Sequence, residues 1–536
     1  MVRALGWEIP ALLSVVAAVG CWTAWLQARP GVVPGAARGE AVDPAVLRGD
    51  LVTVVGDGTP RVVGTPGAAA GRERIAGILS SLGLAVERQR THIERRAGAV
   101  DVENLVAMID GSGTDGAPAI AVVAHSDSVV GSPGASDDGA GVAALCAVAR
   151  ALVARPPVHD VLLLVTDGEE RGLLGAQAFM AQHPAAASLR AVVNLDARGA
   201  AGPAAIFELG PQSAWLSNLI DGSVPAPRTQ SLAAAIYERM PNGTDFTVFV
   251  KAGLSGFNVA FIGDVAAYHR PEDTVERQSP WTRAHLAGTA LALVRGLDAR
   301  WPEGGVIPAG RAVFGDVLGL WVLRWPEAGT TWIVGIAALV LGAGSLRARR
   351  QSTPPSLLAG VSRSLLACLL VVVASCAIGW LAAAVASANG IDLARAPGRA
   401  WGIALLGWLA ASLLAAGGGA WLGRRAVPWD AVIGAWAVWL APTAAAAWVL
   451  PSVSMLLVVP LAAAATACIA ARLWPARGAG VVAVAGAGAA VAAWIPVEPL
   501  AFDALGLSIG AFNGLRAGLV CMLAVPVVAV AVRRAG

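Results

Sequence analysis

Apolar and polar positions follow two different patterns along the chain. Between about Gly31 and Arg300, short apolar runs are separated by stretches rich in charged residues, proline and glycine. Beyond about Ala328, long apolar runs are interrupted only by short segments of arginine, proline or glycine. The first pattern is typical of a globular domain, and the second is typical of helices that span a membrane.

The globular part alternates between apolar strands and helices. We expect strands at 102–111, 119–125, 160–170, 189–199, 205–210 and 254–264, and helices at 139–154, 173–183 and 281–298. Residues 29–70 have the composition of a linker followed by a first helix. Because the strands are apolar throughout and helices separate them, the pattern predicts an α/β fold with a largely parallel central sheet covered on both faces.

The long apolar runs predict a membrane-spanning part. They fall at 329–346, 365–385, 401–422, 431–449, 453–471, 481–497 and 519–532, so about seven helices are expected there, and about eight with an N-terminal run at 10–26. A cleaved signal peptide, or a lipoprotein site at Cys21, is the alternative for the N-terminal run. Since that run continues to Leu26, we favour an uncleaved anchor. The expected domains are an anchor at 1–28, a globular domain at 29–305 and a multi-span domain at 306–536.

Arginine residues predict the orientation in the membrane. They gather in alternate loops between the apolar runs, at 347–350 and 363, at 424–425, at 472 and 477, and at 533–534. The positive-inside rule places these loops in the cytoplasm. Both termini are then cytoplasmic, and the globular domain lies on the extracytoplasmic side, in the periplasm or a lumen.

Composition narrows the classes of partner. Hydrophobic residues make up 56% of the chain and charged residues only 14%, so membrane lipids are an expected partner. The net charge is +3 and no basic patch is interleaved with aromatic residues, so nucleic acid is not an expected partner. Of the six cysteines only Cys146 lies in the globular part, which excludes a disulfide within that part. The sequence indicates no oligomeric state.

Residues of the types that commonly bind metals follow several of the predicted strands. The motifs are His125-Ser126-Asp127, Ser136-Asp137-Asp138-Gly139, Glu169-Glu170, Asn194-Leu195-Asp196, Thr244-Asp245 and Tyr268-His269. Each one alone is explained by a turn, a helix cap or a surface residue. Together they place imidazole and carboxylate groups at the carboxyl edge of one sheet, where α/β proteins build their sites and where zinc finds its ligands.

The ordered set of motifs resembles metallopeptidase family 28, the co-catalytic di-zinc aminopeptidases. The family's HxD, paired acids, Glu-Glu, later acid and final Tyr-His are matched in order between about Val102 and Thr274. Segments 194–208 and 244–269 look most like the membrane-bound branch, which includes the endoplasmic-reticulum metallopeptidase and the vacuolar membrane protease. Asp196 stands where that branch often has glutamate, and both residues donate a carboxylate oxygen.

The resemblance implies a three-layer α/β/α fold like that of the zinc aminopeptidases, with a mixed, largely parallel sheet, and a site for two Zn²⁺ per chain. Asp137 would bridge the two zinc ions. His125 and Asp196 would complete the coordination of one ion, and Glu170 and His269 that of the other.

The resemblance also implies roles for residues beside the ligands. Asp127 would hydrogen-bond the imidazole of His125 and fix its tautomer. Glu169 would be the general base that takes the proton of the attacking water. Tyr268 would donate a hydrogen bond to the oxyanion, with a packing role as an equal alternative. Asp138 is expected to be a helix cap or a supporting acid rather than a ligand.

The leading expectation is a membrane-anchored zinc aminopeptidase that hydrolyses the N-terminal bonds of peptides. The alternatives are an inactive peptidase-like receptor or scaffold, and a transporter with an accessory peptidase domain. A carboxypeptidase, or a cyclase of N-terminal glutamine, would be a variant on the same scaffold. The complete ligand set disfavours the receptor, and the scarcity of ionisable residues in the apolar runs disfavours the transporter. Arg198 either orients a substrate carboxylate or forms an ion pair with Asp196.

Overall fold

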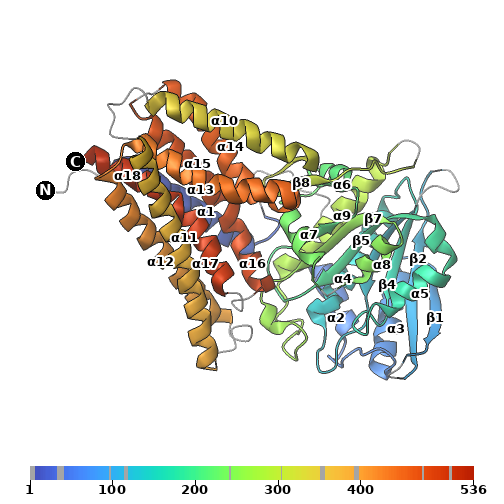
Figure 1. Cartoon of the computed structure of the whole chain (residues 1–536). Coiled ribbons are helices and arrows are strands. Elements are labelled where there is room, and N and C mark those ends of the chain that lie inside the picture. Colours follow the sequence, from blue (N-terminus) through green and yellow to red (C-terminus); the bar gives the residue numbers. More distant parts are fainter. Residues whose placement is uncertain are drawn as a thin grey trace. The chain divides into compact units, whose positions relative to one another are not determined.

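The computed structural model describes residues 6–32, 42–95, 98–113, 119–240, 243–302, 305–349, 357–390, 397–473, 476–505 and 510–535. The chain divides into two compact units (Figure 1). The sheet unit is Trp25–Pro326, and the helical unit is formed by Met1–Ala24 together with Glu327–Gly536. All of the predicted site residues lie in the sheet unit.

The sheet unit alternates between strands and helices. Its strands are β1 (Val86–Ile93), β2 (Val100–Ile109), β3 (Ala119–His125), β4 (Val161–Thr166), β5 (Leu189–Ala197), β6 (Ala205–Leu209), β7 (Ser255–Phe261), β8 (Ala312–Val317) and β9 (Trp321–Pro326). Its helices are α2 (Pro44–Val55), α3 (Pro66–Ser81), α4 (Gly141–Ala154), α5 (Leu174–Gln182), α6 (Ser213–Ile220), α7 (Ser231–Tyr237), α8 (Asp245–Lys251) and α9 (Pro280–Ala299). A π-helical turn over Ala135–Ala140 leads into α4.

Seven of the strands form one sheet in the order β1-β2-β4-β3-β5-β7-β6. The four adjacent strands β4, β3, β5 and β7 are parallel, and β1, β2 and β6 pair with their neighbours in antiparallel fashion. The sheet is therefore mixed and largely parallel, which confirms the prediction. His125 at the end of β3 pairs with Thr166 at the end of β4, so the carboxyl ends of these strands lie side by side.

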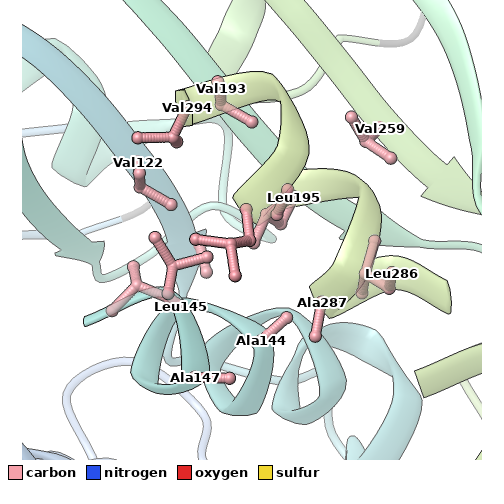
Figure 2. Packing of buried hydrophobic residues seen from close by; sticks show 14 of the residues in the cluster. Val122, Ala144, Leu145, Ala147, Val193, Leu195, Val259, Leu286, Ala287 and Val294 are labelled. Atoms are coloured by element: carbon pink, nitrogen blue, oxygen red, sulfur yellow. The ribbon is translucent and has the colours of Figure 1, made fainter. Parts of the chain in front are cut away.

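Helices cover both faces of the sheet, and the strand residues alternate between the two cores. In β3, Ile120, Val122 and Ala124 pack in a core with α2, α3, α4 and α9, whereas Ala119, Ala121 and Val123 pack in a second core with α5 and α8. Figure 2 shows part of the first core, where side chains of the sheet lie among those of α4 and α9. Burial on both faces explains why β3 is apolar at consecutive positions. The unit is thus a three-layer α/β/α domain, as predicted.

Three helices of the sheet unit begin with a capping residue followed by proline. These pairs are Asp43-Pro44 in α2, Thr65-Pro66 in α3 and Ser279-Pro280 in α9. In each, the capping side chain accepts a hydrogen bond from a backbone N–H of the first turn. Proline is favourable at this position because its missing N–H would have had no partner within the helix.

The structure corrects the prediction near the start of the sheet unit. Two helices, α2 and α3, occupy the region for which the sequence predicts one, and the predicted linker includes residues 33–41, which lie outside the described residues. The edge strand β1 and the hairpin β8–β9 are additional elements. No side chain of β1 is fully buried, so its sequence VERQRTHI has no apolar run that would predict it.

In the part of the chain that the structure describes, eight helices are long and apolar enough to cross a membrane, in agreement with the predicted number. They are Glu8–Ala28, Glu327–Arg347, Leu357–Ala388, Gly402–Gly423, Pro428–Val449, Met455–Leu473, Gly478–Ala501 and Gly510–Arg534. In Figure 1 these correspond to α1 (Glu8–Ala28), α10 (Thr330–Arg349), α11 (Leu357–Ala388), α12 (Pro397–Gly423), α13 (Pro428–Val449), α14 (Met455–Ala470), α15 (Gly478–Trp494) with α16 (Glu498–Leu505), and α17 (Gly510–Met522) with α18 (Ala524–Ala535).

The helical unit contains more ionisable residues near its spans than the sequence pattern indicates. Arg516 lies within the last span, which the sequence predicts to begin only at 519, and its guanidinium is 3.4 Å from the carboxylate of Glu498. Arg349 and Asp430 form a second buried ion pair, at 3.0 Å. Pairing of opposite charges is the usual condition for ionisable side chains in such segments.

Candidate metal centre

The carboxyl ends of three neighbouring parallel strands position most of the candidate ligands. β3 ends at His125, the turn after β4 carries Glu169 and Glu170, and Asp196 is the penultimate residue of β5. Since β3 lies between β4 and β5 in the sheet, His125 has a candidate carboxylate on either side. The topology alone therefore brings together residues that are far apart in the sequence.

The π-helical turn before α4 adds Asp137 and Asp138. Both side chains are buried, and the peptide bond between them is cis. Asp138 accepts hydrogen bonds from the backbone N–H of His125 at 3.2 Å and of Gly141 at 3.0 Å. It thus fixes the start of α4 and the end of β3, a supporting role rather than membership of a ligand group.

The first ligand group consists of His125, Asp137 and Asp196. Nε2 of His125 lies 3.2 Å from Oδ1 of Asp137 and 3.9 Å from Oδ1 of Asp196. One imidazole nitrogen and two carboxylate oxygens therefore converge on one point.

The second ligand group consists of Asp137, Glu170 and His269. Nε2 of His269 lies 3.1 Å from Oδ2 of Asp137 and 3.0 Å from Oε1 of Glu170. The backbone of His269 is left-handed, with φ at 58°. Asp137 belongs to both groups and turns one carboxylate oxygen to each, so the structure brings together all five predicted ligands.

These groups fit metal ions on two observations. In each group, one ligand atom per residue lies within 4.8 Å of the others. Oε1 of Glu170 and Nε2 of His269 are buried and lie 3.0 Å apart, but neither makes a bond with hydrogen-bond geometry to the described residues. Buried polar atoms without a hydrogen bond are costly, and coordination of a cation would satisfy both.

The charges in the two groups compensate one another. Burial alone raises the pKa of Asp137, but contacts with both imidazoles hold it at about 2. Burial lowers the pKa of His269, whereas the carboxylates of Asp137 and Glu170 raise it to about 9. Burial raises the pKa of Glu170 to about 7. The carboxylates thus favour positive charge in the site. In the absence of metal, protons on the imidazoles supply that charge.

Asp127 lies on the side of His125 that faces away from the ligand group. Its backbone carbonyl is 3.2 Å from Nδ1 of His125, and Oδ1 of its carboxylate is 3.5 Å from the same atom. The two carboxylate oxygens also accept hydrogen bonds from the backbone N–H groups of Glu169 and Glu170, at 3.1 and 3.2 Å. Asp127 therefore joins the end of β3 to the turn after β4 and leaves Nε2 of His125 free for the ligand group.

Glu169 lies beside the ligands but in neither group. Burial raises the pKa of its carboxyl group well above the usual range, and the nearby charges of Asp196, Asp245 and Glu170 act in the same direction. Among the described residues its carboxylate has no hydrogen bond or ion pair. The contact of Glu169 with Asp127 is made by its backbone N–H and not by its side chain. A carboxylate in this position is available to accept a proton.

Tyr268 stacks on His269, with 3.7 Å between the ring centroids. Burial, reinforced by the acids of both groups, raises the pKa of its phenol. The phenol stays protonated and can donate a hydrogen bond. The guanidinium carbon of Arg198 lies 5.9 Å from the centroid of the Tyr268 ring, and no ion pair joins Arg198 to Asp196 among the described residues.

Three further residues support the site, and of these the sequence motifs single out only Asp245. Asp273 accepts hydrogen bonds from the backbone N–H of Ser136 and Asp137, and Asp245 accepts one from the hydroxyl of Thr166 at 2.5 Å. Arg61 is fully buried beside the segment that joins His125 to Asp137. The acid four residues after His269 is a signal that could have identified Asp273, whereas nothing around Arg61 indicates a site.

Residues 104–294 match the family model described as "Peptidase family M28". The matched region lies within the sheet unit and includes all five candidate ligands and Glu169, in agreement with the resemblance that the sequence motifs indicate. The chain thus combines a region similar to this peptidase family with eight apolar helices among the described residues.

Curated relatives have names that combine a peptidase or protease with an organelle. The chain is 32% identical over 235 residues to endoplasmic reticulum metallopeptidase 1 of Rattus norvegicus, covering 42% of this chain and 26% of the relative. It is 31% identical over 230 residues to the vacuolar membrane protease of Eremothecium gossypii, covering 41% of this chain and 22% of the relative. The matched part thus spans about a quarter of the length of these relatives.

Solved structures also match about half of the chain. A zinc aminopeptidase from Bacillus subtilis has a TM-score of 0.41 and 17% identity, covering 50% of this chain and 98% of that one. A glutaminyl cyclase from Fimbriiglobus ruber has a TM-score of 0.40 and 21% identity, covering 50% of this chain and 99% of that one.

Proposed function

We propose that this protein is a zinc-dependent aminopeptidase that removes residues from the N-terminal ends of peptides on the extracytoplasmic side of a membrane. The observation that carries the proposal is the carboxylate of Asp137, which turns one oxygen to each of two ligand groups. A shared carboxylate between two such groups suits a pair of metal ions rather than a single one.

The proposed ligands are His125 and Asp196 for one Zn²⁺, Glu170 and His269 for the other, and Asp137 for both. Imidazole nitrogen and carboxylate oxygen are the ligands of catalytic zinc. When bound, the two ions supply Lewis-acid polarisation of the scissile carbonyl and lower the pKa of the attacking water. Strand ends and the turns that follow them hold His125, Glu170 and Asp196, and the turn before α4 holds Asp137.

Glu169 is the proposed general base. Among the described residues its carboxylate has no hydrogen bond or ion pair, and burial raises its pKa, which favours acceptance of a proton. It takes the proton of the water and returns it to the leaving amine. Asp127 keeps His125 in the tautomer that presents Nε2 to the site, and Tyr268 donates a hydrogen bond to the substrate oxyanion.

The arginine-rich loops support an orientation with both termini in the cytoplasm and the sheet unit on the other side. Lipids surround the apolar helices. An inactive receptor is less well supported, because neither a ligand nor the base is missing.

The test of the proposal compares Glu169→Gln with the unaltered chain in hydrolysis of aminoacyl amides. Loss of the base should lower kcat by about 10²- to 10⁴-fold, while the bound zinc stays the same because Glu169 belongs to neither ligand group. Glu94→Gln, at an exposed position away from the site, is the matched control. Full activity in Glu169→Gln or in metal-stripped protein would contradict the proposal.

The aminopeptidase assignment has its own control. An N-acetylated peptide has no free amino terminus, so it should not be cleaved under conditions in which the unmodified peptide is. Equal cleavage of the two would leave a metallopeptidase but overturn the assignment of an aminopeptidase.

A further inference from the structure

Arg61 is a fully buried arginine in the loop between α2 and α3, outside the residues that match the family model. Its guanidinium donates three hydrogen bonds to backbone carbonyls, from Nε to Ser126 at 2.8 Å, from Nη1 to Pro133 at 2.7 Å and from Nη2 to Gly134 at 2.9 Å. Its backbone N–H donates to the hydroxyl of Ser128 at 2.9 Å. All four acceptors belong to the segment between His125 and Asp137.

This segment carries a candidate ligand at each end, and its path depends on Gly134. Gly134 has a left-handed φ of 64°. Its carbonyl accepts hydrogen bonds both from Arg61 and from the backbone N–H of Gly139 at 3.0 Å, across the turn that holds Asp137. A Cβ atom at Gly134 would approach Nη2 of Arg61 to 3.1 Å and the carbonyl oxygen of Asp137 to 2.6 Å. Arg61 therefore packs directly against the turn that presents the shared carboxylate.

Only an arginine can make this set of contacts. The guanidinium presents several N–H groups in one rigid plane, whereas the ammonium of lysine is a single point on a flexible stem. Asp127, Asp138 and Asp273 lie close enough to offset the buried positive charge of Arg61, and burial acts against that charge. The cation thus lies among the acids that support the site rather than among the ligands.

We propose that Arg61 is a positioning residue for the metal centre. It fixes the segment that carries His125 and Asp137, so that one carboxylate faces both ligand groups. This rests on the proposed two-zinc function, and it adds a residue from outside the matched domain to the set that determines zinc affinity.

The test measures zinc affinity of the full chain by titration with a competing chelator, together with kcat, KM and thermal stability. Arg61→Lys keeps the buried charge but cannot reach the three carbonyls at once. We expect zinc affinity to fall by about 10- to 100-fold, the range found when groups that orient metal ligands are removed. Because the displaced groups are ligands and not substrate contacts, kcat at limiting zinc should fall more than KM rises, and saturating zinc should restore part of it.

Arg228→Lys is the matched control. Arg228 is also a buried arginine of the sheet unit, and its guanidinium pairs with Asp316 of β8 at 3.2 Å. It should lose thermal stability and keep its zinc affinity. If Arg61→Lys likewise loses only stability, Arg61 is a structural residue and the proposal is overturned.

Two further outcomes are distinguishable. If the unaltered chain binds no zinc, both the proposed function and this inference fail. If the unaltered chain binds zinc and hydrolyses the substrate, and the zinc affinity of Arg61→Lys is unchanged, only the inference is overturned. If Arg61→Lys does not fold, Ser128→Ala decides, since it removes the acceptor of the Arg61 backbone N–H, together with the bond that the hydroxyl itself donates to the carbonyl of Ser132. A lower zinc affinity supports the inference, and an unchanged affinity overturns it.

Discussion

Asp137 and Asp138 are consecutive buried acids with different partners. Asp137 turns its oxygens to the two imidazoles, whereas Asp138 accepts hydrogen bonds from the backbone of His125 and Gly141. Of these two adjacent aspartates, one is thus a candidate ligand and the other supports the site. Substitution by asparagine makes the same chemical change at both positions, so a difference between the two variants tests this assignment.

Asp137→Asn should abolish binding of at least one of two zinc ions, since a neutral amide is a poor bridge between cations. Asp138→Asn should retain both ions and lose about 1–3 kcal/mol of stability, because one of its two backbone donors loses an acceptor. Metal analysis of the purified variants together with their unfolding curves checks both statements. Equal metal loss in the two variants would contradict the assignment of Asp137 as the shared ligand.

The candidate ligands could be predicted from the sequence because each stands at a strand end or in an acidic motif of recognisable type. The supporting residues could not, since their role depends on contacts across the fold. Arg61 reaches carbonyls up to 73 positions away, and Asp273 binds backbone N–H groups 136 and 137 positions away. Such contacts leave no periodicity or local motif in the sequence.

At the scale of elements, His285 ties α9 to the loop before β6. Its Nδ1 accepts a hydrogen bond from the backbone N–H of Ala204 at 3.0 Å. Burial, together with the charge of Arg228, lowers the pKa of His285 from 6.5 to about 4. The imidazole is therefore neutral in the folded protein at neutral pH.

This lowered pKa predicts a loss of stability in acid. As the pH falls below about 6.5, the unfolded chain binds the proton before the folded chain does, so stability declines until about pH 4. At about 1.4 kcal/mol per pH unit, the loss is on the order of 3 kcal/mol. His285→Asn keeps an acceptor for Ala204 but does not titrate. Thermal unfolding midpoints of the two proteins between pH 7 and 4 should therefore converge or cross, and parallel curves would contradict the prediction.

Strands with both faces buried could be predicted, and so could the edge strand β6, whereas the edge strand β1 and the hairpin β8–β9 could not. The parallel strands β3, β4, β5 and β7 are apolar at consecutive positions because helices cover both faces. β1 is polar because it is an edge strand without fully buried side chains. In β9 only Val322 is buried, so its apolar residues resemble the beginning of the next span rather than a strand.

At the scale of the whole molecule, the proposed orientation predicts which residues are accessible from each side of the membrane. Val158 is exposed in the sheet unit, and Arg425 is exposed in one of the arginine-rich loops. Cysteines at these two positions should react with a membrane-impermeant maleimide from opposite sides.

Val158→Cys and Arg425→Cys should be made separately with Cys21, the exposed native cysteine, replaced by serine. In intact cells that carry the protein in their surface membrane, the first variant should be labelled at once and the second only after the membrane is permeabilised. The chain with Cys21→Ser alone provides the background. The reverse pattern would place the catalytic unit in the cytoplasm and refute the orientation.

The hydrogen bonds from Ser136 and Asp137 to Asp273 have a consequence for synthesis. A growing chain acquires His125, Asp137, Glu170 and Asp196 well before His269 and Asp273. Until those two emerge, the second group has no imidazole, and the N–H groups of Ser136 and Asp137 lack the acceptor that they have in the folded chain. The proposed metal centre therefore remains incomplete until residue 273 of a unit that ends at Pro326 has been made.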